Sequence, residues 1–187
     1  TGTTAIGYQA LLDVTTGSYN TGIGHRAGQN ITTGVRNLAL QPFSLQSLTT
    51  GNDNIAIGYA ALEVATTSSS NVAVGRSALA ANTTASNNTA VGYQAGYSNT
   101  VGTFGTFVGY GAGRSTTTAN NNTFFGHNTG YSTTGAGNNF FGRSDQGFGA
   151  GQLVTTGGRD TIIGGFKGNQ GGLDIRTSNN NIVLSDG

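Results

Sequence analysis

Short apolar runs recur along this chain, and most of them end at a glycine. Each run has apolar residues or Thr at its two ends and a small residue between them, as in Ile55-Ala56-Ile57-Gly58 and Val72-Ala73-Val74-Gly75. Alternation with a period of two residues is typical of a β-strand. Because three residues are too few for a strand with its own core, each strand must pair with neighbours to be stable.

The glycine that closes each run, here called the anchor, returns at a fixed interval. The anchors are Gly7, Gly24, Gly58, Gly75, Gly92, Gly109 and Gly126, spaced by 17 residues with one gap of 34 in which Gln41 holds the anchor position. Such a repeat predicts an all-β fold, a parallel β-solenoid of about ten 17-residue coils. Coils stacked at ~4.8 Å would form a rod roughly 50 Å long.

The repeat loses its regularity near residue 142. Gly142 follows the preceding anchor after 16 residues and Gly164 follows after a further 22, so about five residues are inserted. We therefore predict a regular solenoid over 1–142, and divergent coils with an insertion over 143–187 that form a junction to a following domain. Insertions in solenoids map to loops that often bind ligands, so residues 143–160 are either a binding loop or part of that junction.

Two further columns of the repeat indicate bends. Asn stands four residues before most anchors, where it tolerates left-handed backbone and can form amide ladders between coils. The anchor glycine suits a tight turn with positive φ. A phosphate-binding loop is disfavoured, because the phrase recurs throughout the chain and lacks the lysine of such loops.

The middle position of the run changes from Ala to Phe along the chain, and we expect it to form a seam between identical chains. In a strand this position faces away from its apolar neighbours, and an exposed stripe of Phe is unusual for a soluble monomer. The predicted seam residues are Ala56, Ala73, Ala90, Phe107, Phe124 and Phe140. We accordingly predict a homotrimer with its axis along the rod. The alternative is a monomer whose loops cover the Phe side chains.

Composition narrows the classes of function. Charged residues make up 8% of the chain, against roughly 25% in typical globular domains, and the formal net charge is +1. Without a Lys/Arg cluster or a long apolar run, we expect neither nucleic-acid binding nor membrane insertion. No two of the seven acidic residues share a column on adjacent coils. Because glycoside hydrolysis needs two nearby carboxylates, we predict no catalytic residue and no metal or cofactor, with a polysaccharide depolymerase as the less favoured alternative.

The repeat resembles two related families. Asn54-Ile55-Ala56-Ile57-Gly58 is similar to the head repeat of YadA-like trimeric autotransporter adhesins, although the 17-residue period is longer than usual there. Asn88-Thr89-Ala90-Val91-Gly92-Tyr93-Gln94-Ala95-Gly96 more closely resembles repeats of phage tail-fibre proteins upstream of an endosialidase-type intramolecular chaperone, and residues 157–164 and 178–187 are similar to the segment before that chaperone.

These resemblances imply a homotrimeric, left-handed β-roll in a virion tail fibre. The implied partners are other virion tail proteins and a host cell-surface glycan or protein receptor. Two alternatives stay open: the head of a bacterial surface adhesin, and another extracellular filament of stacked protomers.

The column directly after the anchor holds the candidate ligand contacts. Its members are Tyr8, His25, Tyr59, Arg76, Tyr93, Tyr110, His127 and Arg143, with Pro42 in the degenerate copy. If exposed, these aromatic and hydrogen-bonding side chains could stack on the sugars of a host polysaccharide. The alternative, which the residues alone favour, is that they pack across the seam or bracket a turn.

Overall fold

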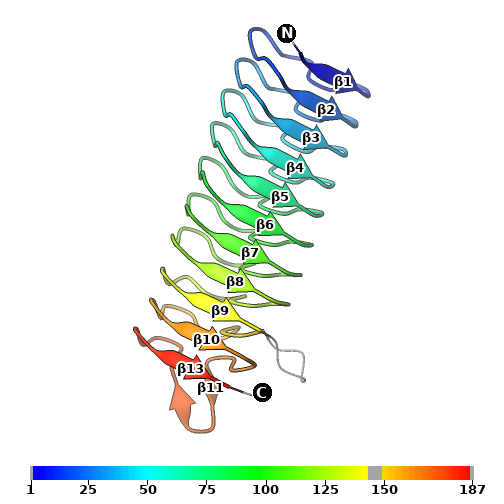
Figure 1. Cartoon of the computed structure of the whole chain (residues 1–187). Coiled ribbons are helices and arrows are strands. Elements are labelled where there is room, and N and C mark those ends of the chain that lie inside the picture. The colour runs from blue at the N-terminus through cyan, green and yellow to red at the C-terminus, as the bar shows by residue number, and fades with distance from the viewer. Residues whose placement is uncertain (1, 143–148, 186–187) are drawn as a thin grey trace.

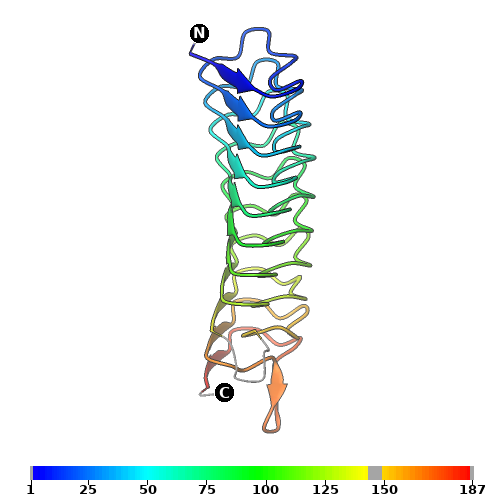
Figure 2. The same ribbon diagram turned by 90° about the vertical axis from the view of Figure 1, so that its right-hand side faces the viewer.

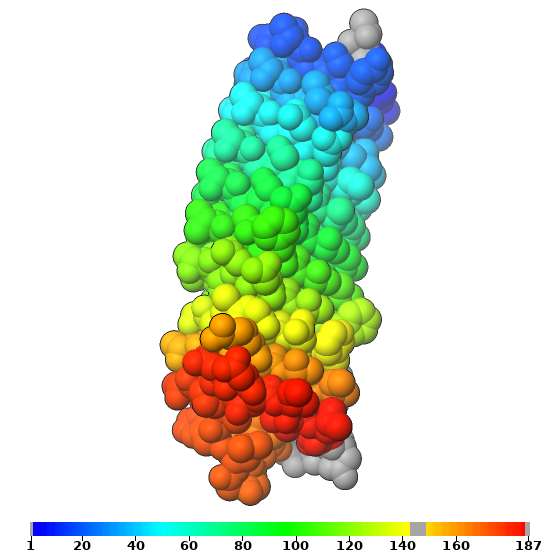
Figure 3. Space-filling view, turned by 60° about the vertical axis from the view of Figure 1, so that its left-hand side comes forward, coloured from blue at the N-terminus to red at the C-terminus, as the bar shows by residue number. Residues whose placement is uncertain are grey.

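The computed structural model describes residues 2–142 and 149–185, which form a rod of stacked coils (Figure 1). Within these residues every regular element is a strand. The strands of the main sheet are β1 (Thr4–Ile6), β2 (Thr21–Ile23), β3 (Leu38–Leu40), β4 (Ile55–Ile57), β5 (Val72–Val74), β6 (Thr89–Val91), β7 (Thr106–Val108), β8 (Thr123–Phe125), β9 (Asn139–Phe141), β10 (Thr161–Ile163) and β13 (Ile182–Leu184). The elongated shape is plain in the space-filling view (Figure 3).

The main sheet runs down one side of the rod, with the loops of each coil on the other side (Figure 2). Its strand order follows the chain from β1 to β10 and ends with β13. Every pairing is parallel and joins equivalent positions of the repeat, such as Ala56 with Ala73 between β4 and β5. The predicted parallel β-solenoid of about ten coils of 17 residues is therefore confirmed.

Coils stack closely because of the anchor glycines. Gly75 has a φ of +133°, and a Cβ there would collide with the backbone carbonyl of Gly92 on the next coil. Only glycine adopts such a backbone without strain. The glycine in the recurring phrase is thus required by coil-to-coil packing.

Two side-chain ladders hold the coils in register. Asn54 is fully buried, and its Oδ1 accepts hydrogen bonds from the backbone N–H and the Nδ2 of Asn71, at 3.1 and 3.2 Å. The Nδ2 of Asn54 donates to the carbonyl of Ser68 at 2.9 Å. On the opposite corner, the Thr49 hydroxyl donates to the carbonyl of Thr66 at 3.0 Å. Equivalent bonds recur along the rod, and the Asn contacts confirm the predicted amide ladder.

The middle residue of each strand points into the rod. The six residues predicted to form a seam between chains, Ala56, Ala73, Ala90, Phe107, Phe124 and Phe140, are all 0% exposed in the single chain. The seam prediction for these residues is wrong, because they fill the core of their own solenoid. The Phe rings stack on one another there, with centroids of Phe124 and Phe140 5.1 Å apart.

The change from Ala to Phe is explained by a compensating change at the coil corner, four residues after the anchor. In most Ala coils this corner carries a buried Leu, as at Leu62 and Leu79, in left-handed backbone with φ of 51° and 50°. In the Phe coils the corner is Gly, and a Cβ on Gly130 would lie 2.6 Å from ring atoms of Phe124. In these coils one large side chain fills the core, supplied by either the corner or the strand, as close packing requires. Where both positions are small, as at Ala90 and Gly96, Leu79 and Phe107 of the adjacent coils lie close to the corner.

The two outer positions of each strand face away from the core and leave an apolar stripe on the surface. Ile6 is 58% exposed, Phe125 55% and Ile163 50%. Ile23, Ile55, Val91, Phe141, Ile182 and Leu184 are also exposed in this stripe. We call this surface the outer sheet face. The sequence predicts the opposite side-chain orientation, with the middle residue of each strand at the surface.

The divergent C-terminal coils continue the same sheet. β10 pairs with β9 on one side and β13 on the other. Between them, β11 (Asn169–Gln170) and β12 (Leu173–Asp174) form an antiparallel hairpin that projects from this end of the rod (Figure 1). Ala150 N–H donates to the Gly142 carbonyl as Ala112 N–H does to that of Gly109, so the regular coil resumes there. Of the segment 143–160, predicted to be a binding loop or a junction, residues 143–148 lie outside the described residues and 149–160 are described.

Candidate functional site

The column after the anchor forms a ladder of stacked side chains along the rod. Tyr8 stacks on His25 with ring centroids 5.4 Å apart. Farther along, Tyr110 stacks between Tyr93 and His127, with centroid distances of 5.1 and 5.2 Å. Arg143, the last predicted member of the column, lies outside the described residues.

The ladder crosses the degenerate coil by using a different residue. Pro42 stands in the column there, and the ring of Phe43 bridges the gap, 5.1 Å from His25 and 5.6 Å from Tyr59. The guanidinium of Arg76 then lies 5.4 Å from the centre of the Tyr59 ring. We call the column from Tyr8 to His127, with Phe43, the ring ladder.

Stacking within the ring ladder limits what its members can bind. Both faces of Tyr110 are covered by neighbouring rings, although 53% of the residue is exposed. A sugar that stacks on an aromatic ring needs a free face. Members covered on both faces therefore offer ring edges and hydroxyl groups. Among the described residues, Tyr8, at the N-terminal end and 66% exposed, has a ring contact on one face alone.

A hollow of about 480 Å³ lies beside the C-terminal part of the ladder. It is lined by Gln94, Tyr110, Arg114, Asn128, Tyr131 and Gln152, which come from four successive coils. Sequence reasoning identified Tyr110 as a candidate ligand contact and placed Gln152 in the segment 143–160, predicted to be a binding loop or a junction. The others belong to the columns two and five residues after the anchor, and the signal for the hollow is Gly111, which removes a side chain between Gln94 and Asn128 in the first of these columns.

Arg114 is the central charged group of this hollow. Its Nε donates to the Gln94 Oε1 at 2.9 Å and its Nη1 to the Tyr131 hydroxyl at 2.7 Å. The guanidinium also lies 5.5 Å from the ring centres of both Tyr97 and Tyr131. These contacts fix the position of the charge. Among the described residues, no carboxylate forms an ion pair with it.

Two polar atoms near the hollow are buried without a hydrogen-bond partner in the described part of the chain. They are the Oδ1 of Asn128 and the Nδ1 of the adjacent His127. Leaving a buried acceptor unsatisfied costs roughly 1–3 kcal/mol. Both atoms are closed off from solvent, so neither is presented to the hollow.

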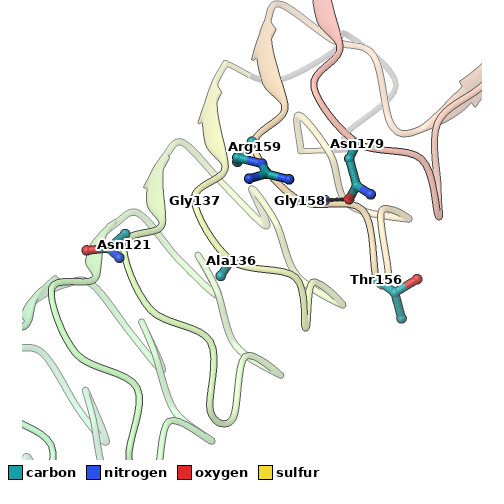
Figure 4. Close-up of a pocket in the computed structure, with 7 residues that line it drawn as sticks. All are labelled: Asn121, Ala136, Gly137, Thr156, Gly158, Arg159 and Asn179. Carbon is teal, nitrogen blue, oxygen red and sulfur yellow. Dashed lines mark hydrogen bonds between the residues drawn. The ribbon is translucent and has the colours of Figure 1, made fainter.

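A second, shallower depression lies nearer the C-terminal end (Figure 4). Its volume is about 390 Å³, and it is lined by Asn121, Ala136, Gly137, Thr156, Gly158, Arg159 and Asn179. The cause is local: Ala136-Gly137 stands where the neighbouring coils carry larger side chains, such as Asn121 and Arg159. The Gly158 N–H is already satisfied by the Asn179 Oδ1 at 2.7 Å.

The ion pairs of the described residues lie elsewhere on the surface. Arg36 and Asp53 pair on neighbouring coils, and the hydrogen bond from Arg36 lowers the pKa of Asp53 below its usual value. In the C-terminal hairpin, side-chain and backbone hydrogen bonds from Arg176 lower the pKa of Asp174 to about 2. Both pairs are exposed and serve local structure.

Searches of the described residues give no sign of a metal centre or a membrane helix. No group of three or more His, Cys, Asp or Glu could hold a metal ion. In the same part of the chain, no helix is long and apolar enough to cross a membrane. Comparison with family models, with curated proteins and with solved structures finds no match to this chain.

Proposed function

We propose that this chain is a structural and adhesive segment of a phage tail fibre. In this proposal three identical chains lie side by side and parallel, the rod holds a receptor-binding part away from the virion, and its surface contacts a host glycan or protein receptor. The observation that carries the proposal is the outer sheet face, an apolar stripe that follows the whole length of the rod.

The periodicity of the outer sheet face argues for an identical partner. Its apolar side chains repeat at the spacing of the coils, as Ile55 and Val72 do in adjacent paired strands. A partner can match every rung only if it has the same rise per coil, which another copy of this chain has. Identical chains that attach by the same terminus to the same neighbouring protein in a fibre must run parallel to one another. The number three comes from the resemblance to trimeric head repeats.

The apolar area is large enough to drive association. Fully burying an aliphatic or Phe side chain contributes about 1.5–3 kcal/mol. Because nine large apolar residues of the outer sheet face are between 37% and 79% exposed, burying them would contribute about 1 kcal/mol each, or roughly 10 kcal/mol per chain, on this scale. Association itself costs an estimated 4–15 kcal/mol, so the stripe is of the magnitude that a stable assembly needs.

Light scattering on the purified chain tests the proposal. The expected mass is three times 18.8 kDa. Ile55→Glu places a charge on the outer sheet face and should reduce the mass to that of one chain. Val64→Glu is the matched control, because Val64 is 40% exposed, close to the 37% of Ile55, but lies outside the sheet. The control should leave the mass unchanged.

Two results would overturn this proposal. A single-chain mass for the native protein would leave the outer sheet face without its partner. A mass that grows without limit as concentration rises would instead favour the end-to-end filament over the fibre of three parallel chains.

A further inference from the structure

Next to the hollow beside the ring ladder, one coil lacks a side chain that other coils carry. At the position two residues after the anchor, other coils carry side chains such as Gln94, Arg26 and Asn128, all in left-handed backbone. Gly111 lacks this side chain, and the Oδ1 of Asn128 lies over it, where a Cβ would collide. The repeat does not need this glycine, since φ at Gly111 is 62°, close to the 53° of Gln94. The missing side chain is therefore a local feature of this part of the rod.

The charge in the hollow favours an anionic ligand. Arg114 is half-buried between two Tyr rings, and its two side-chain hydrogen bonds use two of the five N–H donors of a guanidinium. Three donors on a planar, fixed group remain for a ligand. This geometry matches a carboxylate, which accepts two parallel hydrogen bonds from arginine.

The other groups in the hollow suit hydroxyls. Gln94, Asn128 and Gln152 present amides, each of which both donates and accepts hydrogen bonds. The Oδ1 of Asn128 is closed off from solvent, so Asn128 offers its Nδ2 to a ligand hydroxyl. Tyr110 adds a ring edge and a phenol group. A ligand with one carboxylate and several hydroxyl groups satisfies this set better than a bare anion does.

We propose that this hollow binds an acidic sugar residue, with its carboxylate on Arg114 and its hydroxyls on Asn128, Gln94 and Gln152. The inference rests on the adhesive function proposed above and names the class of glycan that the fibre would contact.

Binding of simple glycosides tests this inference directly. The probes are the methyl glycosides of glucuronic acid and of N-acetylneuraminic acid, with methyl glucoside as the neutral comparison, and binding is measured by saturation-transfer NMR and titration at millimolar concentration. We expect at least one acidic glycoside to bind and methyl glucoside to bind at least about tenfold more weakly, since charge-assisted hydrogen bonds are roughly twice as strong as neutral ones.

Three variants separate the hollow from the rest of the rod. Arg114→Gln should weaken binding of the acidic glycoside about tenfold or more, because it removes the charge. Arg26→Gln is the matched control, since the Nε of Arg26 donates to the Gln9 Oε1 at 3.0 Å, as that of Arg114 does to Gln94, but Arg26 lies outside the hollow. Gly111→Gln restores the side chain found on the preceding coil and should abolish binding.

Several outcomes would overturn the inference. These are no binding of either acidic glycoside, equal binding of methyl glucoside, equal loss in the Arg26 and Arg114 variants, and displacement of the glycoside by inorganic phosphate at equal concentration, which would mark a general anion site. Failure of the fibre proposal would appear separately, in the light-scattering mass, which Arg114→Gln should not change.

Discussion

The exchange of a large side chain between strand and corner predicts a strong coupling between Phe124 and Gly130. Phe124 is fully buried and stacks between Phe107 and Phe140. Truncating a buried Phe to Ala typically costs about 3–5 kcal/mol, so Phe124→Ala should lower the free energy of unfolding by that amount. For a domain whose total stability is about 5–15 kcal/mol, this is a large loss.

Gly130→Leu alone should also destabilise the protein, for the opposite reason. A Cβ at this position would lie 2.6 Å from ring atoms of Phe124, so the ring must move. Overpacking of this kind typically costs about 1–3 kcal/mol. The backbone itself accepts the substitution, because Leu62 holds the equivalent corner position with a φ of 51°, near the 58° of Gly130.

The double variant Phe124→Ala with Gly130→Leu copies the arrangement of Ala56 and Leu62. Its loss in free energy of unfolding should be smaller than the sum of the two single losses, by about 2 kcal/mol or more. This difference lies near the upper end of coupling energies between residues in contact. Urea unfolding followed by circular dichroism measures all three variants. Phe104→Ala is the control, since Phe104 is 59% exposed and its loss should matter little. If the two single costs simply add in the double variant, the proposed exchange between strand and corner is refuted. A change in oligomeric mass caused by Phe124→Ala alone would indicate that Phe124 lies in an interface between chains.

Three further predictions concern single polar groups. Asn54→Ala removes the hydrogen-bond partner of two buried backbone groups. Leaving each unsatisfied costs about 1–3 kcal/mol, so urea unfolding should show a loss of about 2–5 kcal/mol in the free energy of unfolding. An equal loss for Asn30→Ala would contradict this. Asp160→Asn supplies a donor where the buried Oδ2 has no partner in the described residues, and should stabilise thermal unfolding by about 1 kcal/mol; destabilisation would argue against it. Arg176→Gln should return the pKa of Asp174 from about 2 toward 3.8 in a carboxyl NMR titration. Because the folded-state pKa of Asp174 is depressed, the pair stabilises the protein above about pH 4, and this contribution is lost as the pH falls toward 2. The stabilities of the native protein and the variant should therefore converge below pH 2. An unchanged pKa of Asp174 in the variant would contradict the assignment.

The coil architecture was predictable because its causes repeat. A fixed interval between anchors, with Asn four residues earlier, specifies one coil geometry many times over, and Gln41 could be aligned to the anchor despite its identity. Backbone stacking of this kind depends on spacing more than on any single side chain. The divergent coils predicted at the C-terminal end keep the same stacking, since Ile182–Leu184 pairs with β10.

The direction of the strand side chains could not be predicted from the runs alone. In a three-residue strand the apolar count favours placing the two outer residues inside, and the single middle residue outside. The structure does the reverse, because the core is thin and accepts one side chain per strand. The clue was present at the corners, where Leu62 and Leu79 give way to Gly113 and Gly130 as Ala gives way to Phe. That compensation becomes a signal only once strand and corner are known to face each other.

The columns that vary from coil to coil are where the rod can acquire binding. Asn, Thr and anchor positions each have a fixed role in holding one coil to the next, so a change there weakens the whole stack. The columns two and five residues after the anchor vary in residue type from coil to coil, and Ala60, Gln94 and Gly111 all adopt similar left-handed backbone in the first of them. Substitutions in these columns can therefore change the shape of the surface and add ligand-binding side chains on adjacent coils. The register between the coils is kept. This separation explains how a chain built from one repeated coil can carry a charged hollow around Arg114.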